Sequence, residues 1–230
     1  MPEEFAGLMG IAEKRSELGD GFTGAKIGSI DTIVANHGLG KAQAAMTATV
    51  MVERFGCKGL ATAGTAGGLA GIRPLDVLIG TRLIQHDYGR SRGPGQLELY
   101  RPGIPPLPEY LSDQFALELP AAAAARYRKT VSKFEYACFG TFASGDTFVN
   151  DDATRTRLID LGANAVDMEC AAVAQVAEFY NLPWLVAKGI SDDASGMSHE
   201  AFLEGLAEAA RRSATVIASL LDDFVDELSA

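Results

Sequence analysis

The sequence predicts an α/β protein in which helices cover a mixed, mostly parallel central sheet on both sides, a three-layer α/β/α arrangement. Short apolar runs typical of strands alternate with longer helical segments along the 230 residues. An apolar content of 47% over this length can fill a sizeable core. No internal repeat or linker interrupts the pattern, so we expect residues 1–230 to form a single domain.

Helix boundaries are predicted from capping and breaking residues. Pro2 suits the start of a first helix, Gly40 precedes a second, and Pro120 is tolerated at the start of a third. A segment rich in small residues runs to Tyr180 and breaks at Pro183. In chain order, the predicted helices are 3–15, 41–55, 121–129, 151–161, 167–180 and 199–228.

The apolar runs between these helices are predicted to be strands. In chain order they are Ile27 and 30–35, split by Gly28 and Ser29, followed by 59–63, 77–84, 134–143 and 184–190. Residues 86–110 hold five of the nine prolines, which predicts a long irregular loop, and loops of that length are usually functional.

Composition excludes several classes of protein. A net charge of −10 argues against a nucleic-acid partner, because phosphate contacts need a Lys/Arg face, whereas a small molecule is compatible with it. Cys57, Cys138 and Cys170 lie far apart and form no metal or redox motif, which fits a reducing cytoplasm. No signal peptide or membrane-spanning run is recognisable.

The most informative segment is 166–193. Asp167 and Glu169 stand at the start of a predicted helix, and Asp192 and Asp193 follow the next strand. Ligands of open α/β sheets bind at the carboxyl ends of strands, and charges seldom sit among so many apolar residues without a role. From spacing alone, an acidic helix start and an Asp cap are the favoured explanation of these residues.

Four motifs resolve this ambiguity. ATAGTAGGL (61–69), ASGDTFVN (143–150), VDMEC (166–170) and KGISDDA (188–194) occur in that order. Together they resemble the 5′-methylthioadenosine/S-adenosylhomocysteine nucleosidase family of the nucleoside phosphorylase superfamily, over nearly the whole chain. The resemblance implies hydrolysis of the N-glycosidic bond of either nucleoside to adenine and a thioribose, in methionine salvage. It implies a homodimer and no metal or cofactor.

The resemblance also implies roles for the charged residues. Asp192 is similar to the acid that protonates the adenine N7 atom, and Ser191 to the residue that orients it. Glu4 is similar to the base that activates the hydrolytic water. Glu169 resembles the glutamate that binds the ribose hydroxyls, and Lys188 stands where many members have Arg. Asp167 is expected to be structural, and Asp193 to be a cap.

The other implied contacts are to the sugar and the base. Met168 is expected to pack on the sugar, Phe148 to stack on the purine, and the backbone of Val149 to bond the base edge. Thr65, with the backbone of Ala66 and Gly67, is expected to line the ribose and water region. His37, His86 and His199 share no metal-ligand spacing, although His86 could approach the 5′ end of a nucleoside.

Three alternatives stay open. A phosphorylase is disfavoured because phosphorylases of the superfamily carry Arg at the position of Thr62, and a phosphate needs a cation. A nucleosidase for a futalosine-type or another 5′-modified nucleoside fits the same residues. An inactive nucleoside-binding protein is disfavoured by the joint presence of Glu4, Glu169 and Asp192.

The beginning of the chain departs from the family pattern. Members begin with a short apolar strand that leads into a Met-Pro-Glu-Glu turn, and this chain begins at that turn, with Met1 and Pro2. We therefore expect the first strand to be absent. Neighbouring strands would then lose ladder partners, so either the start is misassigned or the fold accepts a frayed edge.

Overall fold

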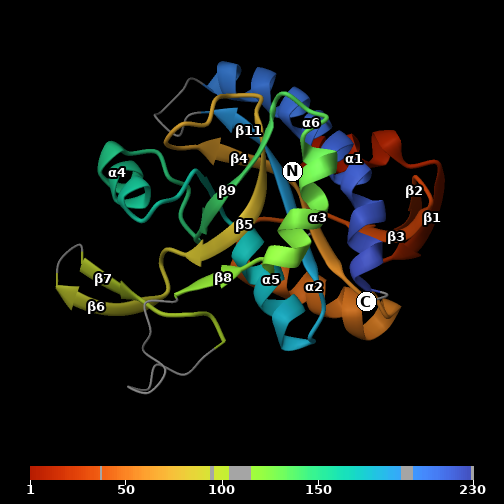
Figure 1. The fold of residues 1–230 in the computed structure, drawn as a ribbon, viewed down its shortest axis with the longest axis horizontal. Coiled ribbons are helices and arrows are strands. Elements are labelled where there is room, and N and C mark those ends of the chain that lie inside the picture. Colours follow the sequence, from red (N-terminus) through yellow and green to blue (C-terminus); the bar gives the residue numbers. More distant parts are fainter. Residues whose placement is uncertain (37, 94–95, 104–114, 193–198, 229–230) are drawn as a thin grey trace.

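A computed structural model describes residues 1–36, 38–93, 96–103, 115–192 and 199–228 (Figure 1). His37, Asp193 and parts of the predicted 86–110 loop therefore lie outside the described residues. The described helices are α1 (Pro2–Ile11), α2 (Lys41–Phe55), α3 (Ala121–Val131), α4 (Asp152–Asp160), α5 (Cys170–Phe179) and α6 (His199–Leu228). The described strands are β1 (Lys14–Gly19), β2 (Phe22–Ile27), β3 (Ile30–Ala35), β4 (Leu60–Gly68), β5 (Val77–Gln85), β6 (Gly89–Gly93), β7 (Gln96–Leu99), β8 (Ala116–Glu118), β9 (Ala137–Ser144), β10 (Ala165–Asp167) and β11 (Trp184–Asp192).

The central sheet has the strand order β11-β4-β10-β9-β5-β8, and a further pairing of β11 with β5 closes it on itself. Its two long ladders, β11 with β4 and β5 with β9, are both parallel. The antiparallel pairings of β10 with β4, β11 with β5 and β5 with β8 span only two or three residues each. The expectation of a mixed, mostly parallel sheet is therefore confirmed.

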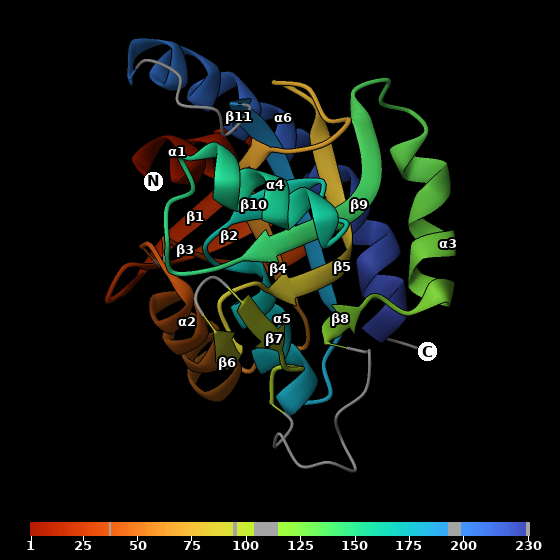
Figure 2. The same ribbon diagram turned by 90° about the vertical axis from the view of Figure 1, so that its left-hand side faces the viewer.

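Helices cover the sheet on two sides (Figure 2). On one side α6 packs on β11 and β4 and is flanked by α1 and α3, and on the other α5 packs on the sheet beneath α2. The core between them consists of strand residues such as Leu78, Ile79 and Ile190 and of the small side chains of α5. Small residues let α5 approach the sheet closely, and this fixes the position of its N-terminus.

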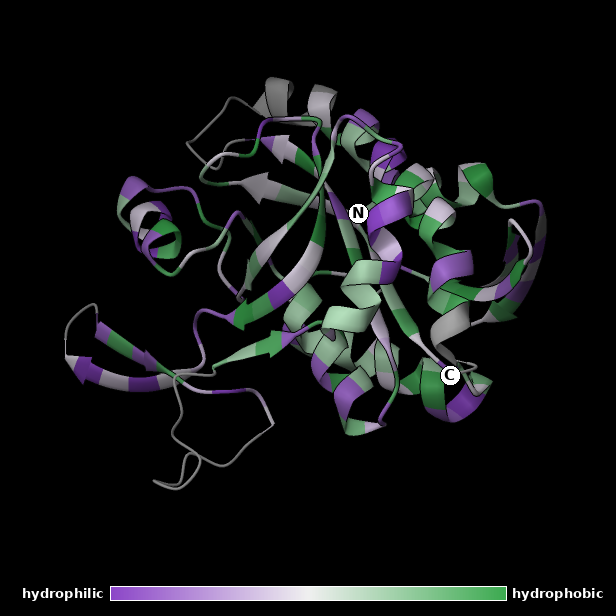
Figure 3. Cartoon of the chain, viewed as in Figure 1, coloured by the Kyte–Doolittle hydropathy of each residue, from purple (hydrophilic) through white to green (hydrophobic). Residues whose placement is uncertain are grey.

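Two smaller sheets lie outside the central one. β1, β2 and β3 form an antiparallel sheet, in that order. β6 and β7 form a polar hairpin that projects from the body (Figures 1 and 3). No helix in the described parts of the chain is long and apolar enough to span a membrane.

The structure corrects several element boundaries. The predicted helix 3–15 ends at Ile11, and its last residues belong to β1, which turns into β2 through Gly19 and Gly21, both at positive φ. β4 continues to Gly68, so the glycine-rich motif lies within the strand and not after it. β11 extends to Asp192, with a shift of register against β4 between Ile190 and Asp192.

Candidate active site

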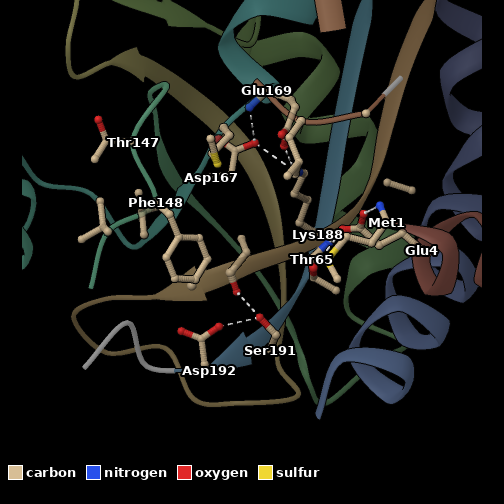
Figure 4. Close-up of a pocket in the computed structure, with 18 residues that line it drawn as sticks. Met1, Glu4, Thr65, Thr147, Phe148, Asp167, Glu169, Lys188, Ser191 and Asp192 are labelled. Atoms are coloured by element: carbon tan, nitrogen blue, oxygen red, sulfur yellow. Dashed lines mark hydrogen bonds and ion pairs between the residues drawn. The ribbon is translucent and has the colours of Figure 1, made fainter. Parts of the chain in front are cut away.

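A cavity of about 100 Å³ lies where β4, β10 and β11 end (Figure 4). All eleven residues to which the family resemblance assigned a role line it, namely Glu4, Thr65, Ala66, Gly67, Phe148, Val149, Met168, Glu169, Lys188, Ser191 and Asp192. They come from five separate segments of the chain, so only the folded sheet brings them together. Figure 4 shows Glu169 and Asp192 at opposite ends of this cavity.

The position of Glu169 is fixed by the local structure of its own segment. Asp167, the last residue of β10, is buried and accepts hydrogen bonds from the backbone N–H groups of Glu169 at 3.1 Å and Cys170 at 2.8 Å. The Ser144 hydroxyl donates to the other oxygen of Asp167. Asp167 thus caps the start of α5, as expected for a structural residue, and turns the Glu169 side chain toward the cavity.

Lys188 holds these two carboxylates. Its side-chain nitrogen lies 2.8 Å from Glu169 Oε2 and 3.0 Å from Asp167 Oδ2, and all three residues are buried. Burial alone would lower the pKa of Lys188, but the charges of Asp167 and Glu169 raise it well above its ordinary value. The cluster therefore contains one lysine cation and two acidic side chains in an apolar setting.

Glu4 lies beside the second half of β4. Its Oε1 atom accepts from the backbone N–H of Thr65 at 2.7 Å and from the Thr65 hydroxyl at 2.8 Å, while Oε2 pairs with the amino group of Met1. Burial alone would raise the pKa of Glu4, but the charge of Lys188 and the hydrogen bonds from Met1 and Thr65 lower it below its ordinary value. At neutral pH Glu4 is therefore a carboxylate that can accept a proton.

Asp192 lies at the end of β11. The Ser191 hydroxyl is 2.7 Å from Asp192 Oδ2 and 3.3 Å from the backbone oxygen of Ala66. Ser191 is buried, whereas Asp192 is partly exposed to the cavity. This pairing fixes the orientation of the carboxyl group.

The remaining wall of the cavity is apolar. The ring of Phe148 is 65% exposed and points into the cavity, where a flat ligand could stack on it (Figure 4). Val149, the next residue, is buried, and both it and Met168 line the cavity. The cavity thus combines carboxyl groups at its opposite ends with an aromatic ring that points into it.

Sequence reasoning missed contacts that come from the loop before α2. The backbone N–H of Gly40 donates to Glu169 Oε1 at 3.2 Å, and that of Lys41 to Asp146 Oδ1 at 2.8 Å. Gly40 has φ 91°, which disfavours other residues there, so its glycine was the one available signal. Leu39 and Thr147 also line the cavity.

His86 and Thr62 lie outside the cavity lining. His86 is buried, its ring packs against Gly145, and burial lowers its pKa, so it is neutral at neutral pH. Thr62 is buried on the face of β4 that points away from the cavity. In the described lining, Lys188 and the Met1 amine are the cationic groups, and both are paired with carboxylates.

Comparison with known proteins agrees with this fold. The model of the "Phosphorylase superfamily" matches residues 2–222. The chain is 31% identical to the 5′-methylthioadenosine/S-adenosylhomocysteine nucleosidase of Mycobacterium tuberculosis (strain CDC 1551 / Oshkosh), over 96% of this chain and 94% of the relative.

Two solved structures are similar over almost their whole length. The 5′-methylthioadenosine/S-adenosylhomocysteine nucleosidase of S. pneumoniae, solved with a transition-state inhibitor, has a TM-score of 0.83 at 29% identity, covering 98% of this chain and 96% of that one. The futalosine hydrolase of Helicobacter pylori has a TM-score of 0.80 at 27% identity, covering 97% and 94%.

The closed mixed sheet with a carboxylate-lined cavity at its strand ends is thus that of a phosphorylase-superfamily protein. Within that superfamily, the chain belongs to the 5′-methylthioadenosine/S-adenosylhomocysteine nucleosidase family.

Proposed function

We propose that the protein hydrolyses the N-glycosidic bond of 5′-methylthioadenosine, S-adenosylhomocysteine or both. The observation that carries this proposal is the gathering of Glu4, Glu169 and Asp192 around one cavity that also exposes the ring of Phe148. Hydrolysis of a purine nucleoside needs four partners. Asp192 would donate a proton to the base, Glu169 would accept from the diol, Glu4 would act as the base for water, and Phe148 would offer an aromatic surface. Relatives at 31% identity carry the same activity in their names.

In the proposed reaction, Asp192 in its protonated form donates a proton to adenine N7 as the bond between the base and C1′ breaks. Both bonding electrons leave with adenine, and positive charge develops on the ribose. A water oxygen then forms the new bond to C1′, and Glu4 accepts the proton that this water loses. The products are adenine and a 5-thioribose. Acid–base assistance of this kind contributes about 10²–10⁴-fold.

Glu169 is proposed to accept hydrogen bonds from the ribose hydroxyls. Oε2 is bonded to Lys188 and Oε1 to Gly40, but a carboxylate has about four acceptor positions, so two hydroxyl donors can still be accommodated. Phe148 would stack on adenine, an interaction worth about 1–3 kcal/mol at nucleic-acid sites. The enclosed volume of about 100 Å³ is small for a nucleoside, so the substrate would also fill the open mouth beside Phe148.

Water is the proposed nucleophile because, among the described residues that line the cavity, no cation is available to phosphate. Lys188 is neutralised by Asp167 and Glu169, and Thr62 stands where a phosphorylase would place an Arg. The test measures adenine release from 5′-methylthioadenosine with and without phosphate. Release without phosphate supports hydrolysis, strict dependence on phosphate supports phosphorolysis, and tight binding without release supports a binding protein.

The second candidate is a nucleosidase for a futalosine-type substrate, favoured by the similarity to the futalosine hydrolase of H. pylori. The same adenine-binding residues would serve a different 5′ group. Turnover of a panel of 5′-substituted nucleosides distinguishes the two, because the preferred substrate has the higher kcat/KM.

We also propose that the protein works as a cytoplasmic homodimer in methionine salvage. Leu39 and Met46, at the start of α2, are 65% and 60% exposed, and apolar side chains exposed beside a site support a subunit contact there. The three free cysteines fit a reducing compartment. Sedimentation of the wild type and of a variant with Met46→Glu tests the dimer, which this substitution should weaken.

A further inference from the structure

A network of charged side chains lies just outside the cavity. It consists of Lys41 at the start of α2, Asp87 after β5 and Asp146 after β9. None of the three belongs to the described lining of the cavity, but two of them are close in sequence to residues that do. Lys41 follows Leu39 by two positions, and Asp146 precedes Phe148 by two. We call these three charged residues the Lys41–Asp87–Asp146 clamp.

The parallel pairing of β5 with β9 brings the two carboxylates together. The register continues to Gln85 and Ser144, the last residues of the two strands. Asp87 and Asp146 each lie two residues further along the chain. Asp87 Oδ2 accepts from the backbone N–H of Asp146 at 2.8 Å, and Asp87 Oδ1 accepts from the side-chain nitrogen of Lys41. Each oxygen of Asp87 therefore holds a different neighbour.

Asp146 closes the network on α2. Its Oδ1 atom accepts from the backbone N–H of Lys41 at 2.8 Å, and its Oδ2 atom lies 3.7 Å from the Lys41 side-chain nitrogen. A Cβ added to Gly40 would lie 3.1 Å from Asp146 Oδ1, so the loop before α2 packs on this carboxylate. Burial alone would raise the pKa of Asp87, but the hydrogen bonds from Lys41 and Asp146 lower it below the ordinary value of 3.8. Asp87 is therefore a carboxylate at neutral pH.

The clamp joins two sides of the site. The backbone N–H of Gly40, next to Lys41, donates to Glu169 Oε1 at 3.2 Å, so the start of α2 is tied to the proposed sugar-binding residue. Asp146 belongs to the loop that carries Phe148, the proposed base-stacking ring (Figure 4). This ring is 65% exposed, so close packing does not fix it, and its place depends on the backbone that carries it.

The clamp should affect geometry more than stability. The side chains of Asp87 and Asp146 are 28% and 55% exposed, and exposed ion pairs contribute little to the free energy of unfolding. In contrast, a displacement of about 1 Å within a site can cost on the order of 10²-fold in rate.

We propose that Asp87 is a positioning residue that holds the ring of Phe148 and the carboxylate of Glu169 at the spacing of one nucleoside. It acts through the other two members of the clamp. The inference rests on the proposed function, because it assigns a further residue to the same site.

The proposed proton donor and the proposed base lie outside the clamp. Asp192 ends β11 and Glu4 lies on α1. Loss of the clamp should therefore weaken substrate binding more than it slows proton transfer, the opposite of the effect expected for a change at Asp192.

The first test is Asp87→Asn. The amide keeps the size of the side chain but has one acceptor oxygen for two donors, so its NH₂ group faces one of them. For 5′-methylthioadenosine, kcat/KM should fall at least about tenfold, with less than about threefold of this in kcat. Glu118→Gln is the matched control, because Glu118 forms an exposed ion pair with Arg82, and it should keep kcat/KM within about twofold. An unchanged kcat/KM in Asp87→Asn, or a loss mainly in kcat, would overturn the proposal.

A double-mutant cycle separates positioning from a general structural effect. In a Phe148→Ala background, Asp87→Asn should lower kcat/KM at most about threefold, because the ring that it positions is gone. The same factor in both backgrounds would show that Asp87 does not act through Phe148.

Hydrogen exchange without substrate tests the clamp itself. In Asp87→Asn the amides of Asp146 and Gly40 should exchange at least about fivefold faster, while Tm should fall by less than about 4 °C. Unchanged exchange would overturn the clamp, and a larger fall in Tm would assign Asp87 a structural role instead. A wild type that releases no adenine would refute the proposed function, and the exchange measurement would then decide on the clamp by itself.

Discussion

The side-chain nitrogen of Lys188 lies 2.8 Å from Glu169 Oε2 and also pairs with Asp167 Oδ2. Glu169 is the residue proposed to hold the sugar, and Asp167 is the buried residue that binds the start of α5. This relationship links the proposed chemistry to the fold, because the same cation pairs with both Asp167 and Glu169. Glu4 also interacts electrostatically with Lys188. Changes to any of these residues should therefore affect both stability and reactivity.

Replacing Lys188 by Met should destabilise the protein by about 3–5 kcal/mol, because two buried acidic side chains lose their cation. Lys188→Arg should cost less, since it keeps the charge. Urea unfolding measures both. Arg73→Met is the matched control, because Arg73 pairs with Asp76 at the surface and such pairs contribute at most about 1 kcal/mol. Equal losses for Lys188→Met and the control would show that the buried cluster does not depend on its cation.

Asp192→Asn should lower kcat at least about 10²-fold, the lower end for acid–base steps, because it keeps the shape but removes the transferable proton. Substrate binding should weaken far less. Steady-state kinetics with 5′-methylthioadenosine measures both, and Asp160→Asn, an exposed change on α4, is the control. Near-normal turnover would remove Asp192 from the mechanism.

Glu169→Gln should cost roughly 2–4 kcal/mol of transition-state stabilisation, since a charged hydrogen-bond acceptor becomes neutral. Removal of the 2′-hydroxyl from the substrate should lower kcat/KM by a smaller factor in the variant than in the wild type. This comparison separates a sugar contact from a general effect on the Lys188 cluster. Identical losses in both proteins would mean that Glu169 does not touch that hydroxyl.

Glu4 should set the acidic limb of the pH profile. Because its pKa is lowered below the ordinary value of 4.5, kcat/KM should fall only when the pH drops below that value. Glu4→Gln should reduce kcat/KM about 10²–10⁴-fold and abolish this limb, whereas Glu3→Gln, one residue away, should retain it. A limb unchanged in Glu4→Gln would assign it to another group.

Acid stability should depend on Asp167. Burial alone would raise its pKa, but Lys188 and the hydrogen bonds of the helix cap lower it below 3.8. A lowered pKa gives stability that is complete above the unfolded value and is lost as the pH falls through the folded value. The stability gap between wild type and Asp167→Asn, read from urea midpoints, should therefore shrink as the pH falls below the ordinary value of 3.8. A constant gap would contradict this.

The sequence predicted some elements better than others for physical reasons. The bounds of α2 (Lys41–Phe55) and α6 (His199–Leu228) were predicted correctly, because each is a long segment with helical periodicity and recognisable ends. Only the first two residues of β1, Lys14 and Arg15, were taken for helix, and the rest of β1 was not predicted as a strand. The charged run in Lys14–Gly19 has no strand-like alternation, and its pairing with β2 determines its conformation. β8 has three residues and is defined only by its pairing with β5.

Motifs identified the residues of the site but not the contacts between them. The eleven predicted residues do lie around one cavity, yet their roles remain predictions. The pairing of Lys188 with Asp167, and the bond from Gly40 to Glu169 across 129 positions, depend on how strands and helices meet in space. No local pattern encodes such distances, which explains why they emerge only from the structure.

The register shift between Ile190 and Asp192 has a consequence for the proposed proton donor. In a regular strand neighbouring side chains point to opposite faces, so the Ser191 hydroxyl could not reach the carboxyl group of the next residue. The two side chains nevertheless lie 2.7 Å apart, since a local irregularity re-aims one of them. An uninterrupted ladder would thus separate the acid from its hydroxyl partner. In the proposed mechanism, reactivity at this end of β11 therefore depends on a defect in the pleat that selection for sheet stability alone would remove.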